Sequence, residues 1–145
     1  MLPRRIGRTK GGLNSKLHAV TDRTGRPLVL LLTEGQIADC TGAHAMLDAI
    51  PPSAASLIGD KGYDSDRLRA DLTRRGIAPC IPPRKGRKHP ATYCTRQYRR
   101  RNAVERFFGR IKDRRRIHTR YDRCADLFMA AITIAAIVSC YINES

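Results

Sequence analysis

The feature that most constrains this fold is a pair of short apolar runs separated by a turn-forming hexapeptide. The runs are Leu17–Thr21 and Leu28–Thr33, and the sequence DRTGRP lies between them. Aspartate, glycine and proline favour tight turns, because each supplies a backbone conformation or a local hydrogen bond that a turn requires. The pattern therefore predicts an antiparallel β-hairpin over residues 17–33. The basic segment before it, Met1–Lys16, contains no acidic residue and is expected to be an irregular lead-in.

Helices and short strands are predicted to alternate along the rest of the chain. The expected elements, in order, are a helix over Ile37–Ile50, a strand over Ser56–Gly59, a helix that ends at Arg75, a strand over Ile77–Ile81, a loop over Arg84–Pro90, an arginine-rich helix from Thr95 to about Arg116, and a last helix over Ala125–Tyr141. Because the two later strands follow helical crossovers, they should be parallel. This order predicts an α/β fold, with a mixed sheet and flanking helices, in a single domain of 145 residues.

The first two helices carry recognisable end signals. Asp39 or Thr41 can cap the first helix, since a side-chain oxygen there can accept a hydrogen bond from a backbone amide of the first turn. Ser65 or Asp64 can cap the second in the same way, and Gly76 is expected to stop it. These signals set the expected boundaries of both helices.

The chain is strongly basic, and its charge is concentrated. Lysine and arginine number 28 against 13 acidic residues, which gives a formal net charge of +15. Fourteen of the basic residues fall between Arg84 and Arg116, where only Glu105 and Asp113 oppose them. A polyanion such as nucleic acid is therefore the expected partner. The alternative is a solvated basic face with no specific ligand.

The cysteines and the apolar C-terminal segment exclude other classes of protein. The five cysteines and four histidines form no pairs with zinc-ligand spacing, so a structural zinc site is not predicted. Dispersed cysteines without a signal peptide are typical of reduced thiols in a cytosol. Leu127–Ile142 is uncharged and apolar for 16 residues, which is short of the roughly 20 that span a bilayer. It is expected to be buried in the protein or at a subunit contact, with no membrane involved.

Four residues of the arginine-rich helix share an unusual spacing. In the sequence YRRRNAVERFFGRIK, they follow the pattern Tyr-x2-Arg-x3-Glu-x6-Lys, which places Tyr98, Arg101, Glu105 and Lys112 within one stripe roughly 60° wide on an α-helix. Val104, Phe107, Phe108 and Ile111 occupy a neighbouring apolar arc. A single carboxylate among cations at the border of an apolar face indicates an acid at a packed surface that faces something negatively charged.

Asp60 and Glu105 are the candidate catalytic carboxylates. Asp60 follows an apolar strand, and ligands of α/β proteins gather beyond the carboxyl ends of strands, although a turn or capping aspartate is an equal alternative. Arg101 and Lys112 would stabilise the ionised form of Glu105, which suits a metal ligand; a salt-bridged helix surface without catalysis is the alternative. Two such carboxylates can hold Mg²⁺ or Mn²⁺, and the metal activates an attacking oxygen at a phosphate.

These residues belong to three longer motifs that resemble a known family. GRTKGGLNSKLHAVTDRTGRPLVLLLTEGQIADCTGA, LIGDKGYDSDRLR and YRRRNAVERFFGRIKDRRRIHTRYDR are similar to the bacterial DDE transposases of the insertion-sequence-five group, over nearly the whole chain. The resemblance implies a ribonuclease H-like fold and a metal-binding triad of two aspartates and a glutamate. It also implies hydrolysis at transposon inverted repeats, followed by strand transfer. Asp60 matches the second aspartate and Glu105 the glutamate. Tyr98, Arg101 and Lys112 match the supporting residues of the glutamate motif, and Lys112 is expected to be catalytic with the two acids.

The first catalytic aspartate of the family has no counterpart here. In the family it lies on a strand before the GRTKGG-like stretch, and no acidic residue of this chain precedes Asp22. Asp22 belongs to the hairpin turn and is expected to be structural. We therefore expect an N-terminally incomplete catalytic domain that lacks the first strand and is inactive alone. It would be either the downstream reading frame of a split transposase or a truncated remnant.

The expected partner is double-stranded DNA, both transposon inverted repeats and target DNA, in the bacterial cytoplasm at the nucleoid. A second copy of the chain or an upstream-frame product is the expected protein partner. The predicted DNA contacts are Tyr98, Arg101 and Lys112, with Arg84, Lys85, Arg87, Lys88, Arg99, Arg106 and Arg110. One alternative is a non-catalytic DNA-binding regulator of the intact transposase. A basic RNA-binding protein is the weaker alternative, because only 6% of residues are aromatic.

Overall fold

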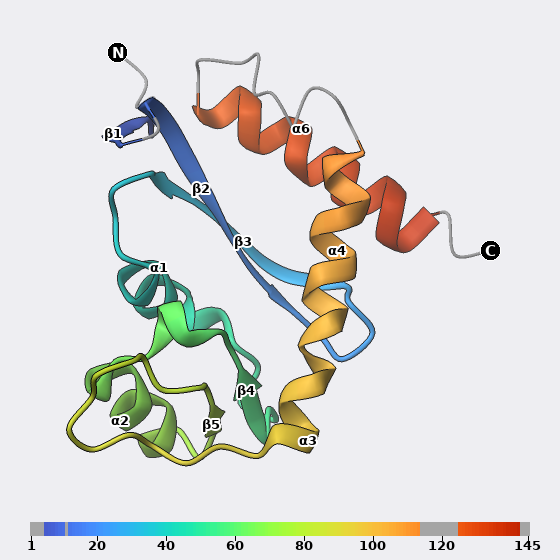
Figure 1. Cartoon of the computed structure of the whole chain (residues 1–145). Helices are drawn as coiled ribbons and strands as arrows, with labels where there is room; N and C mark the ends of the chain where they lie inside the picture. Colours follow the sequence, from blue (N-terminus) through green and yellow to red (C-terminus); the bar gives the residue numbers. More distant parts are fainter. Residues whose placement is uncertain (1–4, 11, 114–124, 143–145) are drawn as a thin grey trace. The chain divides into compact units, whose positions relative to one another are not determined.

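The computed structural model describes residues 5–10, 12–113 and 125–142, and Figure 1 shows its helices and strands. The chain divides into two compact units. The first unit comprises Met1–Ile37 and Ala103–Ser145, and the second unit comprises Ala38–Asn102.

The first unit contains a three-stranded antiparallel sheet. Its strands β1 (Gly7–Thr9), β2 (Gly12–Thr21) and β3 (Pro27–Glu34) are adjacent in chain order, and Leu17 of β2 lies opposite Leu32 of β3. The predicted hairpin is therefore confirmed, and both of its strands are longer than expected.

The prediction of an irregular lead-in is wrong for the described residues, because 7–9 and 12–16 are strand. Gly12, the first residue of β2, has a φ of 103°, which lies in the left-handed region that glycine adopts without steric strain. Further along β2, Lys16 pairs with Thr33. The first half of β2 is mostly polar and lacks the alternation of apolar and polar residues by which a strand is recognised in a sequence. It is a strand because its backbone pairs with β1 and β3.

Asp22 organises the hairpin turn, as predicted. Its Oδ1 atom accepts hydrogen bonds from the Thr24 amide at 2.9 Å, the Thr24 hydroxyl at 2.6 Å and the Arg26 amide at 3.0 Å. Burial raises the pKa of this carboxyl, but these hydrogen bonds outweigh burial and hold the pKa below its usual value. Asp22 is thus committed to the turn by three bonds.

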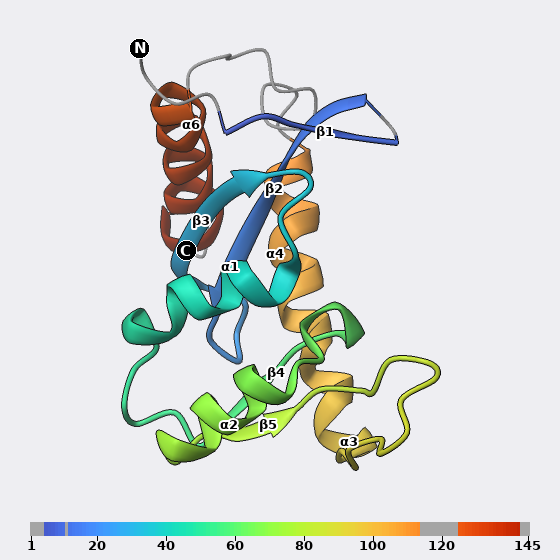
Figure 2. The ribbon, with the colours of Figure 1, turned by 90° about the vertical axis from the view of Figure 1, so that its left-hand side faces the viewer.

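Two helices of the first unit pack on its sheet. They are α4 (Asn102–Lys112) and α6 (Ala125–Ile137), and a π-helical segment, Val138–Ile142, continues α6. Both lie against the same side of β2 and β3 in Figures 1 and 2. The buried residues at these contacts are Leu32, Phe107, Ile111, Ala125, Phe128, Ile132, Ala136 and Cys140. None of the described helices, α6 included, has the length and hydropathy that crossing a bilayer needs.

The second unit contains a two-stranded parallel sheet. Strand β4 (Ser56–Ile58) leads through helix α2 (Asp66–Arg74) to β5 (Ala78–Cys80), and Ile58 lies opposite Cys80. The predicted parallel pair is confirmed. Its core is made of buried aliphatic residues in α2, on either side of β5, and directly after α1 (Asp39–Met46), namely Leu47, Leu68, Leu72, Ile77 and Ile81.

The capping predictions were right for one helix and wrong for the other. Ser65 caps α2, since its hydroxyl accepts a hydrogen bond from the Leu68 amide at 3.4 Å, and Gly76 follows the helix with a φ of 75°. The N-cap of α1 is Ala38, which has no side-chain acceptor. Neither Asp39 nor Thr41 caps that helix, and Asp39 lies in its first turn instead.

The α/β class is confirmed, but the predicted single mixed sheet is not what the described residues form. Their strands make two separate ladders, one of three antiparallel strands and one of two parallel strands. Each ladder buries an apolar surface against helices of its own unit.

The arginine-rich segment begins at the predicted residue but is not a uniform α-helix. It comprises α3 (Thr95–Tyr98), a 3₁₀ turn (Arg99–Arg101) and α4. Three residues complete a turn of a 3₁₀ helix, so residues three apart lie one above the other. This geometry places Arg101 over Tyr98 more directly than an α-helix would. Arg114–Arg116, at the predicted end of the helix, lie outside the described residues.

Candidate functional site

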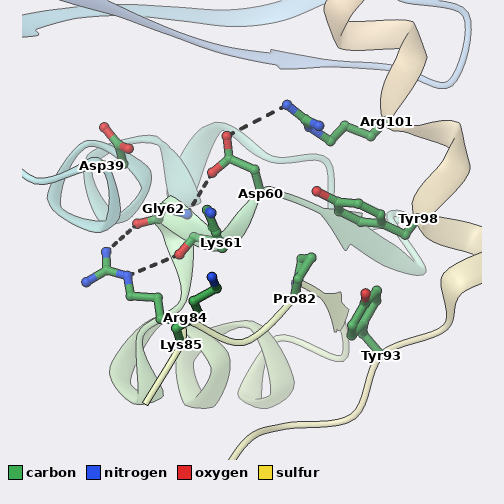
Figure 3. Close-up of a pocket in the computed structure, with 10 residues that line it drawn as sticks. All are labelled: Asp39, Asp60, Lys61, Gly62, Pro82, Arg84, Lys85, Tyr93, Tyr98 and Arg101. Carbon is green, nitrogen blue, oxygen red and sulfur yellow. Dashed lines mark hydrogen bonds and ion pairs between the residues drawn. The ribbon is translucent and has the colours of Figure 1, made fainter. Parts of the chain in front are cut away.

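Asp60 lies two residues beyond β4, at the carboxyl ends of the parallel strands. Its Oδ1 atom accepts a hydrogen bond from the Gly62 amide at 2.8 Å, which makes it the N-cap of the 3₁₀ turn Lys61–Tyr63. Its other oxygen, Oδ2, points toward Arg101 (Figure 3). Asp60 is therefore a turn residue through one oxygen and presents the second at the position where α/β proteins bind ligands.

A hollow of about 800 Å³ opens beside Asp60 (Figure 3). All of its lining residues belong to the second unit: Asp39, Asp60, Lys61, Gly62, Pro82, Arg84, Lys85, Tyr93, Tyr98 and Arg101. Four of them are cations and two are acids, so the hollow has a net positive charge that favours an anionic ligand.

Two residues of the predicted stripe, Tyr98 and Arg101, meet Asp60 at this hollow. The Arg101 Nη2 atom lies 4.0 Å from Asp60 Oδ2, and the Arg101 Cζ atom lies 5.9 Å from the centre of the Tyr98 ring. The Tyr98 ring meets the Tyr93 ring nearly edge-on, with their centroids 5.5 Å apart. A long, partly exposed ion pair contributes about 1 kcal/mol or less. The ion pair with Asp60 therefore contributes little to the stability of the fold.

Asp39 is the residue of this site that the sequence reasoning assigned only to capping. A Cβ atom built on Gly62 would lie 2.5 Å from Asp39 Oδ2 and 2.9 Å from Asp60 Oδ1, so the two carboxylates approach each other across this glycine. Burial and the charges of both carboxylates affect the pKa of the neighbouring Tyr63 phenol. Burial, followed by the charges of Asp39 and Asp60, raises its pKa to about 12, which keeps it neutral at physiological pH. No local sequence signal pairs Asp39 with Asp60, because the intervening fold brings them together.

Replacing Gly62 with alanine should disturb this arrangement. The added Cβ has no room between the two carboxylates, so both must rotate, and Asp60 loses its hydrogen bond from the residue-62 amide. We expect the free energy of unfolding to fall by about 1 kcal/mol in urea denaturation. Gly109→Ala is the control: a Cβ at that helical position meets no atom within 4 Å, so alanine should raise the free energy of unfolding through its higher helix propensity. Equal stability of Gly62→Ala and the wild type would contradict the crowding.

Asp64 is the centre of a buried ion network behind the hollow. Its side chain is 0% exposed and accepts hydrogen bonds from Arg69 Nε at 3.0 Å, Arg87 Nη1 at 2.6 Å and the Arg84 amide at 2.8 Å. Burial raises the pKa of Asp64, but the hydrogen bonds from Arg84, Arg87 and Arg69 outweigh it and lower the pKa to about 2. Of the two predicted capping candidates, Ser65 caps the helix, and Asp64 ties the Arg84–Pro90 loop to it.

The predicted DNA contacts of this loop fall into two kinds. Arg84 donates to the carbonyls of Lys61 and Gly62, and Arg87 pairs with Asp64 and Asp66. Lys85 lines the hollow and is exposed, and Lys88 is exposed. Both arginines are therefore engaged within the second unit.

The remaining predicted residues lie outside the hollow. Glu105, Arg106 and Lys112 are exposed on α4, and Arg110 is half-buried on the same helix, in the first unit. Arg99 is exposed in the second unit. The approach of Glu105 and Lys112 to Asp60, and hence the four-residue stripe, stays a prediction.

The acidic residues of the hollow are of the type that binds a hard divalent cation, but the hollow has only two of them. Asp39 and Asp60 offer carboxylate oxygens, the ligand type that Mg²⁺ and Mn²⁺ prefer. Within residues 5–10, 12–113 and 125–142, no three His, Cys, Asp or Glu side chains come together as a metal site. The donor set is thus compatible with such an ion once a further carboxylate joins it.

Comparison with known proteins identifies the family. The family model for the transposase DDE domain matches residues 4–140. The chain is 33% identical over 156 residues to a protein of Burkholderia cepacia described as a transposase for insertion sequence element IS402, covering 95% of this chain and 72% of that protein. It is also 33% identical over 124 residues to a protein of Brucella ovis described as a transposase for IS6501, covering 85% and 95%. No solved structure matches. The chain therefore belongs to the DDE transposases of bacterial insertion sequences.

Proposed function

We propose that this chain carries the transposition chemistry of an insertion sequence: metal-dependent cleavage of DNA at terminal inverted repeats, followed by strand transfer into target DNA. The observation that carries the proposal is the position of Asp60. It lies at the carboxyl ends of two parallel strands, beside a cation-lined hollow that Tyr98 and Arg101 also line. Because the chain belongs to the DDE family, we assign a catalytic role to the acid at this position.

In this proposal Asp60 and Glu105 hold a Mg²⁺ or Mn²⁺ ion. When bound, such an ion lowers the pKa of an attacking water or 3′-hydroxyl and offsets the charge that develops on the phosphate. Arg101 and Tyr98 orient the scissile phosphate, and Lys112 supplies a further positive charge near it. The 4.0 Å separation of Arg101 Nη2 and Asp60 Oδ2 supports this division, because it places the guanidinium beside the carboxylate at which the phosphate would react.

We also propose that both units are parts of one ribonuclease H-like catalytic domain. The β2–β3 hairpin and the parallel β4–β5 pair would then join a first strand that carries the family's first aspartate. That strand and acid would come from a segment outside these 145 residues or from an upstream-frame product. The formal charge of +15 supports duplex DNA as the partner, in the bacterial cytoplasm at the nucleoid.

The test compares this chain with a chimera that joins it to the segment of a family member carrying the first aspartate. With Mg²⁺ and a labelled inverted-repeat duplex, we expect the chimera to nick and join DNA and the 145-residue chain to do neither. Both should bind duplex DNA with an affinity that falls steeply with salt, since counterions are released from each contacted phosphate. Cleavage by the chain alone would contradict the need for a further carboxylate, and a folded but inactive chimera would contradict the catalytic role.

A non-catalytic regulator is the second candidate function, favoured by exposed apolar side chains on α6. Leu127 is 58% and Ile134 63% exposed, which suits contact with another protein chain. A regulator would bind the intact transposase or its DNA and reduce transposition. Titration of this chain into an active chimera reaction tests this function, and undiminished cleavage at excess chain would exclude it.

A further inference from the structure

The loop after β5 carries two arginines and two lysines, and the structure gives the two residue types different surroundings. Arg84 is an exposed residue, yet its guanidinium turns back to the chain: Nε donates to the Lys61 carbonyl at 3.1 Å and Nη2 to the Gly62 carbonyl at 2.8 Å. Figure 3 shows this fork closing on the turn that follows Asp60. The planar guanidinium, with several fixed donors, suits two carbonyls at once in a way that a lysine ammonium does not.

The turn that Arg84 holds is the one that positions Asp60. The Gly62 amide donates to Asp60 Oδ1 at 2.8 Å, and the Asp64 amide donates to the Lys61 carbonyl at 3.2 Å. A peptide unit is rigid, so fixing the carbonyls of residues 61 and 62 limits the rotation of the neighbouring amides. Arg84 therefore acts on the Asp60 carboxylate through one intervening turn.

Arg87 is engaged on the other side of the loop. Its guanidinium pairs with Asp64 at 2.6 Å and with Asp66, and its side chain is 20% exposed. Arg69 shares the Asp64 carboxylate and also donates to the Ile81 carbonyl at 2.7 Å, at the start of the loop. The charge of Arg87 is thus balanced by acids of its own unit, which leaves little of it for a phosphate.

The lysines have the opposite character. Lys85 is exposed and lines the hollow next to Arg84, and Lys88 is exposed one residue after Arg87. A lysine on a surface loop behaves as a compact positive charge on a long, adaptable stem, which is suited to the DNA backbone.

We propose that this loop divides its work by residue type: Arg84 is a positioning residue for Asp60, Arg87 tethers the loop, and Lys85 and Lys88 contact DNA phosphates. This inference rests on the proposed function for the identity of the ligand as DNA. It replaces the prediction that all four cations of the loop bind DNA alike. The loop would then link DNA binding to the orientation of Asp60, because the lysines that contact DNA and the arginine that positions Asp60 are neighbours in it.

Two measurements on the 145-residue chain test the division. In binding to a labelled duplex over a range of salt, Lys85→Gln and Lys88→Gln should each lower the slope of log affinity against log salt by about 0.9, the loss of one phosphate contact. Arg84→Gln and Arg84→Lys should leave that slope unchanged. In hydrogen exchange, the two arginine variants should exchange the amides of Gly62 and Asp64 roughly tenfold faster, since the bonds that hold the turn are lost. The lysine variants should leave this exchange unchanged.

A third measurement separates positioning from general stability. In the chimera, Arg84→Gln should lower kcat with little change in KM, whereas Lys85→Gln should mainly raise KM. A salt slope lowered by Arg84→Gln as much as by Lys85→Gln, with unchanged exchange at residues 62 and 64, would overturn the positioning role. Unchanged slopes in both lysine variants would overturn the DNA contacts. Loss of the proposed catalysis is a separate result, because exchange and salt slopes are measured without turnover.

Discussion

Asp60→Asn and Glu105→Gln are each expected to lower DNA cleavage by the chimera roughly a thousandfold or more. A catalytic metal supplies several kcal/mol of stabilisation to the transition state, and each 1.4 kcal/mol lost is about a factor of ten in rate. The substitutions keep size and shape while removing the negative charge that a divalent cation requires. Asparagine at position 60 also retains an oxygen that can accept the hydrogen bond now made by the Gly62 amide. The initial rate of strand nicking in Mg²⁺ measures the effect.

The control for this experiment is an acid of the second unit that lies away from the hollow. Asp48 is 93% exposed and pairs only with Arg75 among the ion pairs described in this unit. Asp48→Asn should cleave at the wild-type rate, because an exposed pair of this kind contributes little. Turnover within a few-fold of wild type for Glu105→Gln would show that Glu105 is not a metal ligand. The same result for Asp60→Asn would remove the basis of the proposed function.

Asp64→Ala is expected to destabilise the protein by about 3–5 kcal/mol, the usual cost of removing one partner from a buried ion pair. The loss leaves Arg69 and Arg87 facing each other with side chains only 12% and 20% exposed. It also removes the acceptor of the Arg84 amide. Urea denaturation at neutral pH measures the change, and Asp48→Ala at the surface should cost less than about 1 kcal/mol. A cost for Asp64→Ala as small as that of the control would contradict the buried network.

The stability that the Asp64 carboxylate contributes should depend on pH in a direction set by its lowered pKa. The pKa of Asp64 is lowered from its usual value near 3.8 to about 2 in the folded protein. A carboxyl with a lowered folded-state pKa stabilises the fold fully above its unfolded pKa, and this contribution is lost as pH falls toward the folded value. The stability difference between wild type and Asp64→Asn should therefore be constant between pH 5 and 8 and shrink below about pH 4. A difference that changed near neutral pH would point to another group.

Local patterns predicted the elements of this fold better than their assembly. The DRTGRP turn and the strands on either side were found because turn chemistry and apolar runs act within a few residues, and the bonds of Asp22 follow directly from its place in that turn. The polar first half of β2 was missed, since its pairing depends on a partner strand and not on its own side chains. The division into two sheets was missed for the same reason.

The candidate site was predicted in part. The motifs identified Asp60, Tyr98 and Arg101, which the second unit does bring to one hollow. They did not identify Asp39 as a neighbour of Asp60, because nothing in a helix-start aspartate reveals which loop packs beside it. They also did not indicate the partners of Arg84 and Arg87 within the second unit, since the charge of an arginine is visible in a sequence whereas the carbonyls and carboxylates that bind it are not.

The shared carboxylate of Asp64 has a consequence for how this family can diverge. Arg69 and Arg87 are 18 positions apart, yet both depend on the same acid. Loss of Asp64 leaves two guanidinium groups without their shared partner, whereas loss of one arginine leaves the acid paired with the other. Homologous sequences that lack the acid should therefore lack both guanidinium partners too, whereas either arginine can vary while the acid is kept, a substitution pattern that sequencing alone can reveal.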